Sequence, residues 1–297
     1  MGLPGKFDNA DTNNFTNVTF VVTDGYVDIA KADVTLKSAD LTKPYDGTAL
    51  TNKNGGETET PLATESGFAE GEGATYIFSG SQTVVGSSAN TFSYTLNEGT
   101  KAENYNITKT EGTLTVTNRD AKYQITVKAN SATATYDGEQ HSATGIETNE
   151  FTVEGNVYTV SGLATENPVK TNAGTYPNNI TGTAVVTDAN GNDVSDQFEV
   201  TTENGSLVID KAAVTMKSAS DEWTYDGNEH AKHEMESVTG FAEGEGATFA
   251  YTGAITNVGE KKNTYTYTLN ANTSADNYTF AEPEYGTLKV NPVTDKV

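Results

Sequence analysis

Three copies of one pattern run along the sequence, and this repetition constrains the fold more than any other feature. The triplet Tyr-Asp-Gly occurs at Tyr45-Asp46-Gly47, Tyr136-Asp137-Gly138 and Tyr225-Asp226-Gly227. Residues 67–75 recur without change at 240–248. Each copy ends in a strand-like segment that begins with glycine, at 112–116, 205–209 and 286–290. Copies one and three are therefore close relatives, and copy two is a divergent version.

Apolar residues alternate with polar ones inside each copy, which is the period of a half-buried β-strand. Val34 and Leu36 alternate with Thr and Lys, and Tyr265, Tyr267 and Leu269 alternate with Thr. Turn residues recur about every ten positions, and no segment has a helical period. The pattern predicts an all-β chain of antiparallel β-sandwiches of immunoglobulin-like size. A β-grasp-like sheet is the alternative, disfavoured by the missing helix signal.

The repeats predict the domain boundaries. We expect repeat 1 over 30–119, the divergent repeat 2 over 120–211 and repeat 3 over 212–297, after a leader at 1–29 that resembles the last strands of a truncated preceding repeat. A tag followed by a native leader strand is the alternative for that leader. The junctions are only about four residues long and are not flexible linkers. They predict an elongated, semi-rigid, monomeric rod within a longer chain, roughly 100 Å in length.

The composition excludes several classes of function. With 18 Lys+Arg against 41 Asp+Glu, the net charge is −23, and the only arginine is Arg119. Nucleic acids and anionic membranes are therefore not expected partners, because both require clustered basic residues. The chain has no Cys, which rules out disulfides, Cys-ligated metals and Cys nucleophiles. No apolar run is long enough to insert in a membrane.

These features together resemble the YDG/MBG-type tandem repeats of bacterial cell-surface proteins and adhesins. The matching elements are the leading Val-Thr-x-Lys strand, Tyr-Asp-Gly, the Ala-Gly-Thr-Tyr turn at 173–176, Asn-Tyr, and the closing Gly-Thr-Leu strand. The resemblance implies an extracellular, secreted or wall-anchored bacterial surface protein in which such repeats form a non-enzymatic stalk that spaces or presents an adhesive region. Two alternatives stay open: a module that binds host glycan or matrix protein, and accessory repeats of a large extracellular hydrolase.

The positions of the histidines do not indicate a catalytic site. The chain has only His141, His230 and His233. The first two stand three residues after a Tyr-Asp-Gly glycine, where copy one has Leu50. A position that accepts leucine is structural, and no nucleophile, base and orienting group converge in the pattern. We therefore expect no enzyme.

Tyr-Asp-Gly itself has a structural interpretation. We expect the tyrosine to anchor the core, the aspartate to close the turn through its side chain, and the glycine to take a positive φ. The segments from 145 to 177 in copy two and 51 to 62 in copy one depart most from the shared pattern. A specific activity would sit there.

One loop of copy two is a candidate calcium site, and otherwise no cofactor is expected. Hard oxygen ligands alternate along this loop as a Ca²⁺ site requires. The candidate ligands are Asp188, Asn190, Asn192, Asp193 and Asp196. The loop lacks the glycine and glutamate positions of an EF-hand, and an ordinary Asn/Asp-rich turn is the alternative.

Three further sets of residues are candidate sites. Trp223 aligns with Lys43 and Ala134, so we expect a partly exposed ring that could stack on a sugar. Paired acids between glycines could bind a cation or a basic partner, at Glu70, Glu72, Glu243 and Glu245. Equivalent first-strand lysines could form isopeptide bonds, but alternation places them on the outer face: Lys37, Lys128 and Lys217.

Overall fold

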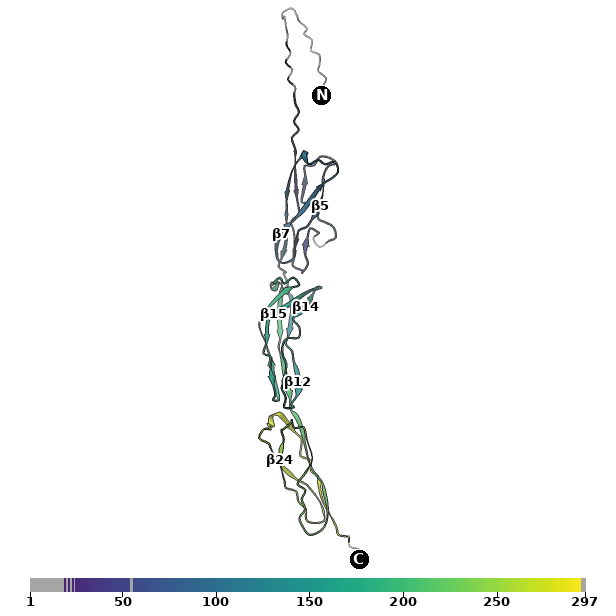
Figure 1. Ribbon diagram of the computed structural model, residues 1–297, viewed down its shortest axis with the longest axis vertical. Coiled ribbons are helices and arrows are strands. Elements are labelled where there is room, and N and C mark those ends of the chain that lie inside the picture. The colour runs from purple at the N-terminus through teal and green to yellow at the C-terminus, as the bar shows by residue number, and fades with distance from the viewer. Residues whose placement is uncertain (1–18, 20, 22, 24, 54–55, 295–297) are drawn as a thin grey trace, which may run out of the picture. The chain divides into compact units, whose positions relative to one another are not determined.

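The computed structural model describes residues 19, 21, 23, 25–53 and 56–294, and these form an all-β, sandwich-like structure (Figure 1). Most of the predicted leader lies outside the described residues. Residues 25–29, expected as the last strand of a truncated repeat, are described and form no strand. The described part contains no α-helix, only three single 3-10 turns. It therefore offers no helix to support the β-grasp alternative. Nor does it contain a helix long and apolar enough to cross a membrane.

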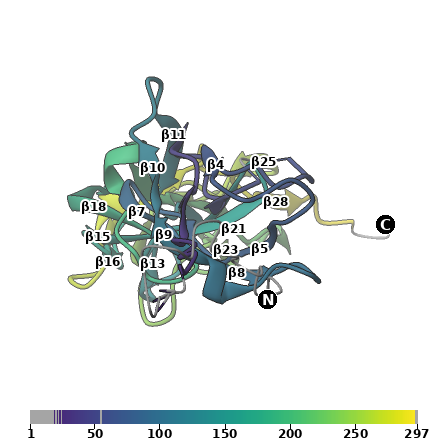
Figure 2. The ribbon, with the colours of Figure 1, turned by 90° about the horizontal axis from the view of Figure 1, so that it is seen from above.

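Repeat 1 contributes the first ten strands. Its sheets have the orders β4-β1-β9, β2-β10-β7, β3-β6 and β5-β8, and β5 lies next to β8 when the ribbon is seen from above (Figure 2). The elements are β1 (Ala32–Lys37), β2 (Leu41–Pro44), β3 (Leu50–Thr51), β4 (Thr64–Ser66), β5 (Ala74–Phe78), β6 (Ser81–Gln82), β7 (Gly86–Asn90), β8 (Phe92–Leu96), η1 (Ala102–Asn104), β9 (Tyr105–Thr110) and β10 (Gly112–Thr117).

Repeat 2 has the same framework with one larger antiparallel sheet. The sheet orders are β11-β19, β12-β20-β17, β13-β16 and β14-β15-β18. The elements are β11 (Tyr123–Lys128), β12 (Ala132–Thr135), β13 (His141–Ser142), β14 (Glu150–Val153), β15 (Asn156–Thr165), β16 (Val169–Lys170), β17 (Gly174–Asn178), β18 (Ile180–Asp188), η2 (Ser195–Gln197), β19 (Phe198–Glu203) and β20 (Gly205–Asp210).

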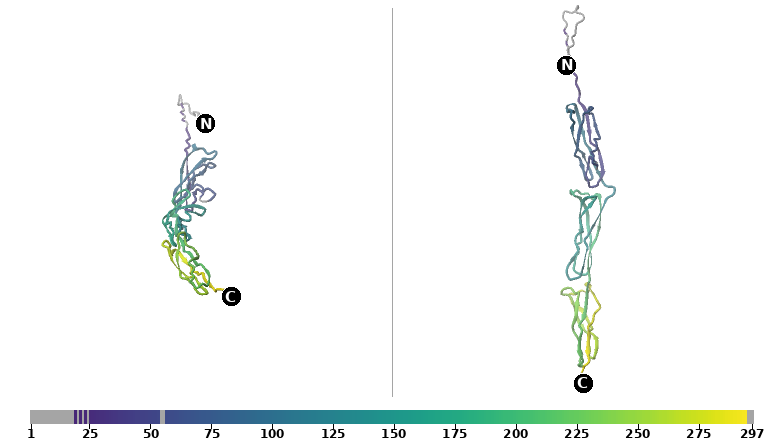
Figure 3. Two further views of the ribbon diagram at one scale, coloured as in Figure 1. Left: turned by 60° about the horizontal axis from the view of Figure 1, so that its bottom comes forward. Right: turned by 90° about the vertical axis from the view of Figure 1, so that its right-hand side faces the viewer.

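Repeat 3 returns to the arrangement of repeat 1. Its sheets are β23-β21-β27, β22-β28-β25 and β24-β26, and its strands lie alongside one another in both views of Figure 3. The elements are β21 (Ala212–Ser218), β22 (Asp221–Thr224), β23 (Met235–Thr239), β24 (Ala247–Tyr251), β25 (Gly259–Lys262), β26 (Tyr265–Leu269), η3 (Ala275–Asn277), β27 (Tyr278–Phe280) and β28 (Thr287–Asn291).

The prediction of purely antiparallel sheets was wrong. The first strand of each repeat pairs in parallel with the strand before the last, as in β1 with β9, β11 with β19 and β21 with β27. The second strand pairs in parallel with the last strand in β12–β20 and β22–β28. Alternation shows which side of a strand is buried but says nothing about the direction of its neighbour. The remaining assigned pairs, such as β5–β8 and β15–β18, are antiparallel.

The predicted burial of alternate residues is confirmed. Val34 and Leu36 are buried in β1, and β11 alternates strictly between buried and exposed positions.

Contacts between residues divide the chain into two compact units. Unit 1 covers 1–42, 50–82 and 87–115, and unit 2 covers 43–49, 83–86 and 116–297. The first Tyr-Asp-Gly turn thus belongs to unit 2, together with repeats 2 and 3.

Candidate functional site: the Tyr-Asp-Gly turns and their sockets

The three Tyr-Asp-Gly turns share one geometry. In each, the aspartate Oδ1 accepts a hydrogen bond of 2.9 Å from the backbone N–H two residues later. Each glycine has a positive φ, of 78°, 86° and 80° in chain order. These bonds and angles confirm the predicted roles of the aspartate and the glycine. Residues with a Cβ rarely adopt such a positive φ, which explains the glycine at this position.

The backbone of each tyrosine is fixed to the end of its own repeat. The Tyr136 amide donates to the carbonyl oxygen of Asp210 at 2.8 Å, and the Tyr225 amide donates to that of Asn291 at the same distance. The Tyr45 amide donates to the carbonyl of Thr117 at 2.9 Å. Each turn is therefore held against the last strand of its repeat, and the direction of its tyrosine ring is set by the backbone.

The histidines support the turns. His141 Nε2 lies 3.0 Å from Asp137 Oδ1, and His230 Nε2 lies 2.9 Å from Asp226 Oδ1. Hydrogen bonds from the Glu139 backbone and then from His141 hold the pKa of Asp137 below its usual value. These contacts agree with the structural role predicted for both histidines.

Repeat 1 closes its turn with a different partner. The position of the histidine is taken by Leu50, which is buried. Lys43 Nζ instead lies 2.7 Å from Asp46 Oδ1. Burial raises the pKa of Asp46, but the hydrogen bonds from Lys43 and Thr48 outweigh it and lower the pKa below its usual value.

Tyr45 and Tyr136 are buried in cores, as expected, but the core around Tyr136 is not confined to its own repeat. Tyr136, 6% exposed, belongs to a core cluster that continues from Leu207 and Ile209 of repeat 2 to Val214 and Met216 of repeat 3. The turn stands at the end of its repeat, so the ring reaches the next repeat instead of turning back. Tyr225, in the last repeat of the chain, is 41% exposed.

Tyr136 enters a site on repeat 3 that we call the repeat-3 socket, formed by Phe241, Ala242, Glu245 and Tyr278. The Tyr136 and Tyr278 rings meet edge to face, with centroids 5.3 Å apart at 87°. Phe241 also packs edge to face with Tyr278, at 5.2 Å and 69°. Such aromatic pairs add about 1 kcal/mol beyond the burial of their surface.

One carboxylate organises this socket. Glu245 Oε1 accepts a hydrogen bond from the Tyr136 hydroxyl, and Glu245 Oε2 accepts one from Tyr278 at 2.8 Å. The Ala242 amide donates to the Tyr278 hydroxyl at 3.0 Å. Burial, followed by the bond to Glu245, raises the pKa of Tyr136. Burial likewise raises the pKa of Tyr278, to about 12.

The two acids of each Glu-Gly-Glu motif therefore differ in role. Glu245 binds two tyrosine hydroxyls, and Glu72 in repeat 1 accepts one from Tyr105 at 2.7 Å. Glu70 and Glu243 are exposed. That these acids bind a cation or a basic partner stays a prediction.

Tyr45 is buried in unit 2, where repeat 2 has a different socket. Tyr45 is 1% exposed, and its hydroxyl donates to the Tyr158 hydroxyl at 3.4 Å. Burial raises the pKa of Tyr45 well above its usual value. The Tyr158 ring packs edge to face on Phe198 at 4.7 Å. Phe198 begins β19, and Tyr278 begins β27, its counterpart in repeat 3.

Arg119, the only arginine of the chain, links Tyr45 to Tyr123 in this second site. Its Nη1 donates to the Tyr45 carbonyl at 2.9 Å and to the Tyr123 hydroxyl at 2.8 Å. The guanidinium carbon lies 3.9 Å from the centre of the Tyr123 ring, a cation–π geometry. The Tyr123 hydroxyl also donates to Glu154. Burial and then Glu154 raise the pKa of Tyr123 to about 12.

The divergent segment of copy two builds part of this site. Glu154, Asn156 and Tyr158 lie on or beside the β14–β15 hairpin, and Asn156 Nδ2 donates to the Asp46 carbonyl at 3.2 Å. Part of the divergent segment at 145–177 therefore supplies residues of the site that holds Tyr45. A specific activity for that segment stays a prediction.

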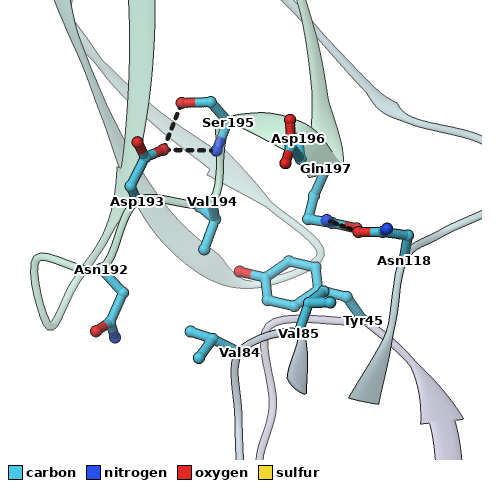
Figure 4. Close-up of a pocket in the computed structure, with 10 residues that line it drawn as sticks. All are labelled: Tyr45, Val84, Val85, Asn118, Asn192, Asp193, Val194, Ser195, Asp196 and Gln197. Atoms are coloured by element: carbon cyan, nitrogen blue, oxygen red, sulfur yellow. Dashed lines mark hydrogen bonds between the residues drawn. The ribbon is translucent and has the colours of Figure 1, made fainter.

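The candidate calcium loop borders a hollow of about 560 Å³ near Tyr45 (Figure 4). Asp188 Oδ1 accepts from the amides of Asn190 and Asn192, both at 2.9 Å. Asp193 accepts from the Ser195 hydroxyl at 2.6 Å, and in Figure 4 its carboxylate turns toward Ser195 while the Asn192 amide points away. The two carboxylates thus bond to groups of their own loop.

No group of three or more His, Asp or Glu side chains that could hold a metal occurs within the described ranges. Asp196 borders the same hollow as Asn192 and Asp193. Calcium binding through the mixed Asp/Asn set stays a prediction.

The remaining candidates lie on the surface. Trp223 is half-buried, as expected, and one ring face stacks on His230 at 4.9 Å and 13°. The three first-strand lysines point outward, as predicted. They form surface ion pairs with acids, Lys37–Asp40, Lys128–Glu203 and Lys217–Glu236.

Comparisons with known proteins place this chain in no family. No family model matches the sequence, and no curated protein matches it. A crystal structure of Drosophila N-cadherin EC1-3 aligns over 89% of this chain and 98% of that one, with 11% identity and a TM-score of 0.19. A TM-score this low carries no argument about fold or function.

Proposed function

We propose that this chain is a non-enzymatic structural stalk of tandem, immunoglobulin-like β-sandwich repeats from a bacterial cell-surface protein, which spaces or presents an adhesive region. The observation that carries the proposal is the packing of Tyr136 of repeat 2 into repeat 3, here called the interlock. Tyr136 of one repeat is buried in the other, and a single core continues across both. Only Lys211 separates β20 from β21. A spacer needs such stiff junctions, because flexible linkers let the ends approach each other.

The acidic surface fits this role. A net charge of −23 spread over the chain makes it repel itself, which favours extension and solubility. The resemblance to YDG/MBG-type repeats supports an extracellular, cell-surface location. The side chains around the turns are engaged in packing and turn closure, which fits a structural part better than a catalytic one.

Small-angle X-ray scattering of the whole chain tests the spacer. We expect a maximum dimension of at least roughly 100 Å, the reach of three such domains placed end to end. A particle with the dimensions of a compact three-domain globule would contradict the proposal. The variant Tyr136→Ala supplies the comparison, because loss of the interlock should broaden the distribution of distances while each repeat stays folded.

A glycan array with the wild-type chain and Trp223→Ala tests the binding-module alternative. The stalk proposal predicts no signal that depends on Trp223. Binding that is lost in the variant would favour a glycan-recognition role instead.

A further inference from the structure

We infer that each repeat resists a pulling force through a mechanical clamp, formed where its first strands pair in parallel with its last strands. The inference goes beyond the spacer role, because a spacer must be long and stiff, whereas a clamp lets the chain bear tension. Repeat 2 shows the arrangement in full. Its clamp consists of two tracks, residues 123–135 and residues 198–210, that lie side by side.

The repeat-2 clamp keeps one register along its length. β11 pairs in parallel with β19, and β12 pairs in parallel with β20. Partners stand 75 positions apart in the first pair, as for Gln124 and Glu199, and still do so in the crossing that follows, as for Ser131 and Ser206. The two tracks therefore run beside each other without a shift, although the chain passes from one sheet to another.

The crossing between the two strand pairs is also closed. The Ala129 amide donates to the Glu203 carbonyl at 2.9 Å. Gly205 begins the last strand and passes so close to the first track that a Cβ built on it would clash with the Asn130 carbonyl oxygen. This close approach explains the glycine at the start of the last strand. The same clash with the backbone of the first track occurs at the corresponding glycines of the other repeats, Gly112 and Gly286.

The chain enters repeat 2 at one end of the clamp and leaves it at the other. It enters at Tyr123, the first residue of β11, and leaves at Asp210, the last residue of β20. Because both tracks run in the same direction, a pull on the two ends of the repeat draws them in opposite directions along their length. The hydrogen bonds between them are then loaded together. Forced unfolding depends on the unfolding barrier, and this barrier is high when many bonds must break at once.

Side chains strengthen the clamp on both of its faces. Lys128 Nζ lies 2.6 Å from Glu203 on the outer face, and the Thr126 and Thr201 hydroxyls lie 2.9 Å apart. The inward side chains of both tracks are buried, at Ile125, Val127, Leu207 and Ile209. A slip of one residue would turn such apolar side chains to the opposite face. Sliding one track past the other therefore breaks the core together with the backbone bonds.

The residues between the two tracks carry no load while the clamp holds. Residues 137–197 leave the end of the first track and return to the start of the second, so a force on the ends of the repeat does not pass through them. They include the divergent segment at 145–177 and the candidate calcium loop. This shielded segment can therefore vary in sequence while the repeat still bears tension.

The other repeats contain the same pairing. β1 pairs in parallel with β9 in repeat 1, and β21 with β27 and β22 with β28 in repeat 3. In repeat 3 a parallel bridge between Lys217 and Glu284 continues the pairing toward the crossing. At the crossing of both repeats a buried serine accepts a hydrogen bond from the amide of the closing glycine, Ser38 from Gly112 at 2.8 Å and Ser218 from Gly286 at 3.0 Å.

Optical-trap pulling of the full chain between two chosen residues tests the clamp. The chain has no Cys, so a pair of introduced cysteines attaches DNA handles at defined points. Lys122→Cys with Lys211→Cys pulls along the clamp. Lys122→Cys with Glu199→Cys pulls β11 away from β19 at the end where both begin. All three positions are exposed, and thermal unfolding checks that both variants keep the fold, so that only the direction of the force differs.

We expect the force that opens repeat 2 to be at least about threefold higher along the clamp than across it at the same loading rate, because pulling across breaks the bonds one after another. Equal forces in the two directions would overturn the inference. Both measurements load only repeat 2, and neither depends on the overall dimensions of the chain. Failure of the clamp is therefore distinguishable from failure of the spacer proposal, which scattering tests.

A second variant checks the path of the force. Inserting about ten Gly/Ser residues between Asn190 and Gly191, in the shielded segment, should leave the opening force along the clamp unchanged and lengthen the released chain by roughly 35 Å. An insertion that lengthens the molecule before repeat 2 opens would show that the shielded segment carries the load, and would overturn the inference.

Discussion

The Tyr136 hydroxyl donates a hydrogen bond to the carboxylate of Glu245, which stands 109 positions later in the sequence. The two residues belong to different repeats, so one bond ties the Tyr-Asp-Gly turn of repeat 2 to the loop between β23 and β24 of repeat 3. Because the same carboxylate also accepts from Tyr278, the ring of repeat 2 and the first residue of β27 share one acceptor. The junction is therefore a continuation of the core, and its stability should depend on a few identifiable groups.

Removing the ring of Tyr136 should destabilise unit 2 far more than removing that of Tyr225. Tyr136→Ala leaves a cavity between two repeats, and deletion of a buried aromatic ring costs about 3–5 kcal/mol. Tyr225→Ala removes a ring that is 41% exposed, and we expect a change within about 0.5 kcal/mol. Urea unfolding followed by tyrosine fluorescence and circular dichroism measures both. Equal losses for the two variants would show that the tyrosine acts within its own repeat.

The two glutamates of the repeat-3 motif provide a matched pair of variants. Glu245→Gln keeps the shape of the side chain but weakens two charge-assisted hydrogen bonds, and we expect a loss of about 1–3 kcal/mol in the free energy of unfolding. Glu243→Gln, two residues earlier and exposed, should change it by less than about 0.5 kcal/mol. A stability loss at Glu243 as large as that at Glu245 would contradict the assigned role of the socket carboxylate.

The strands and the closing of the turns could be predicted from the sequence, since both are local. Alternation at Val34 and Leu36 is a property of neighbouring residues, and so is the pairing of an aspartate with a glycine in a turn. Strand direction could not be predicted in this way. The parallel pairing of β21 with β27 joins segments that are more than sixty residues apart, and no local pattern encodes which neighbour a strand selects.

The partner of each tyrosine was missed for a similar reason. A buried aromatic residue is equally compatible with its own core and with that of a neighbour. A signal was nevertheless present. Residues 240–248 contain Phe241, Ala242 and Glu245 of the repeat-3 socket and are identical to 67–75, while copy two lacks that run. Identity over a whole loop indicates that its side chains make specific contacts, which an ordinary surface loop does not require.

Arg119 should be difficult to replace, even by lysine. Its guanidinium donates to the Tyr45 carbonyl and the Tyr123 hydroxyl while it lies over the Tyr123 ring. A lysine cannot reproduce this planar fork, so Arg119→Lys should lower the free energy of unfolding of unit 2 by about 1–2 kcal/mol. The exposed Lys122, three residues later, supplies the control, and Lys122→Ala should have almost no effect. Similar values for both variants in urea unfolding would argue against the fastening role.

Alkaline pH should loosen the structure through the buried tyrosines. Burial raises the pKa values of Tyr123, Tyr265 and Tyr278 to about 12, while an unfolded tyrosine titrates near about 10. The folded protein therefore holds these protons where the unfolded chain has lost them. The stabilisation is complete below pH of about 10 and is lost as pH rises toward about 12.

Two measurements on the same samples check this expectation. The free energy of unfolding in urea should fall between those pH values at constant ionic strength, and tyrosinate absorbance should show a second group of phenols that ionise late. Tyr278→Phe removes one late-titrating hydroxyl and should reduce that second group. A single ionisation near the ordinary tyrosine pKa, with stability unchanged up to pH of about 12, would contradict the burial of these hydroxyls in the sockets and cores.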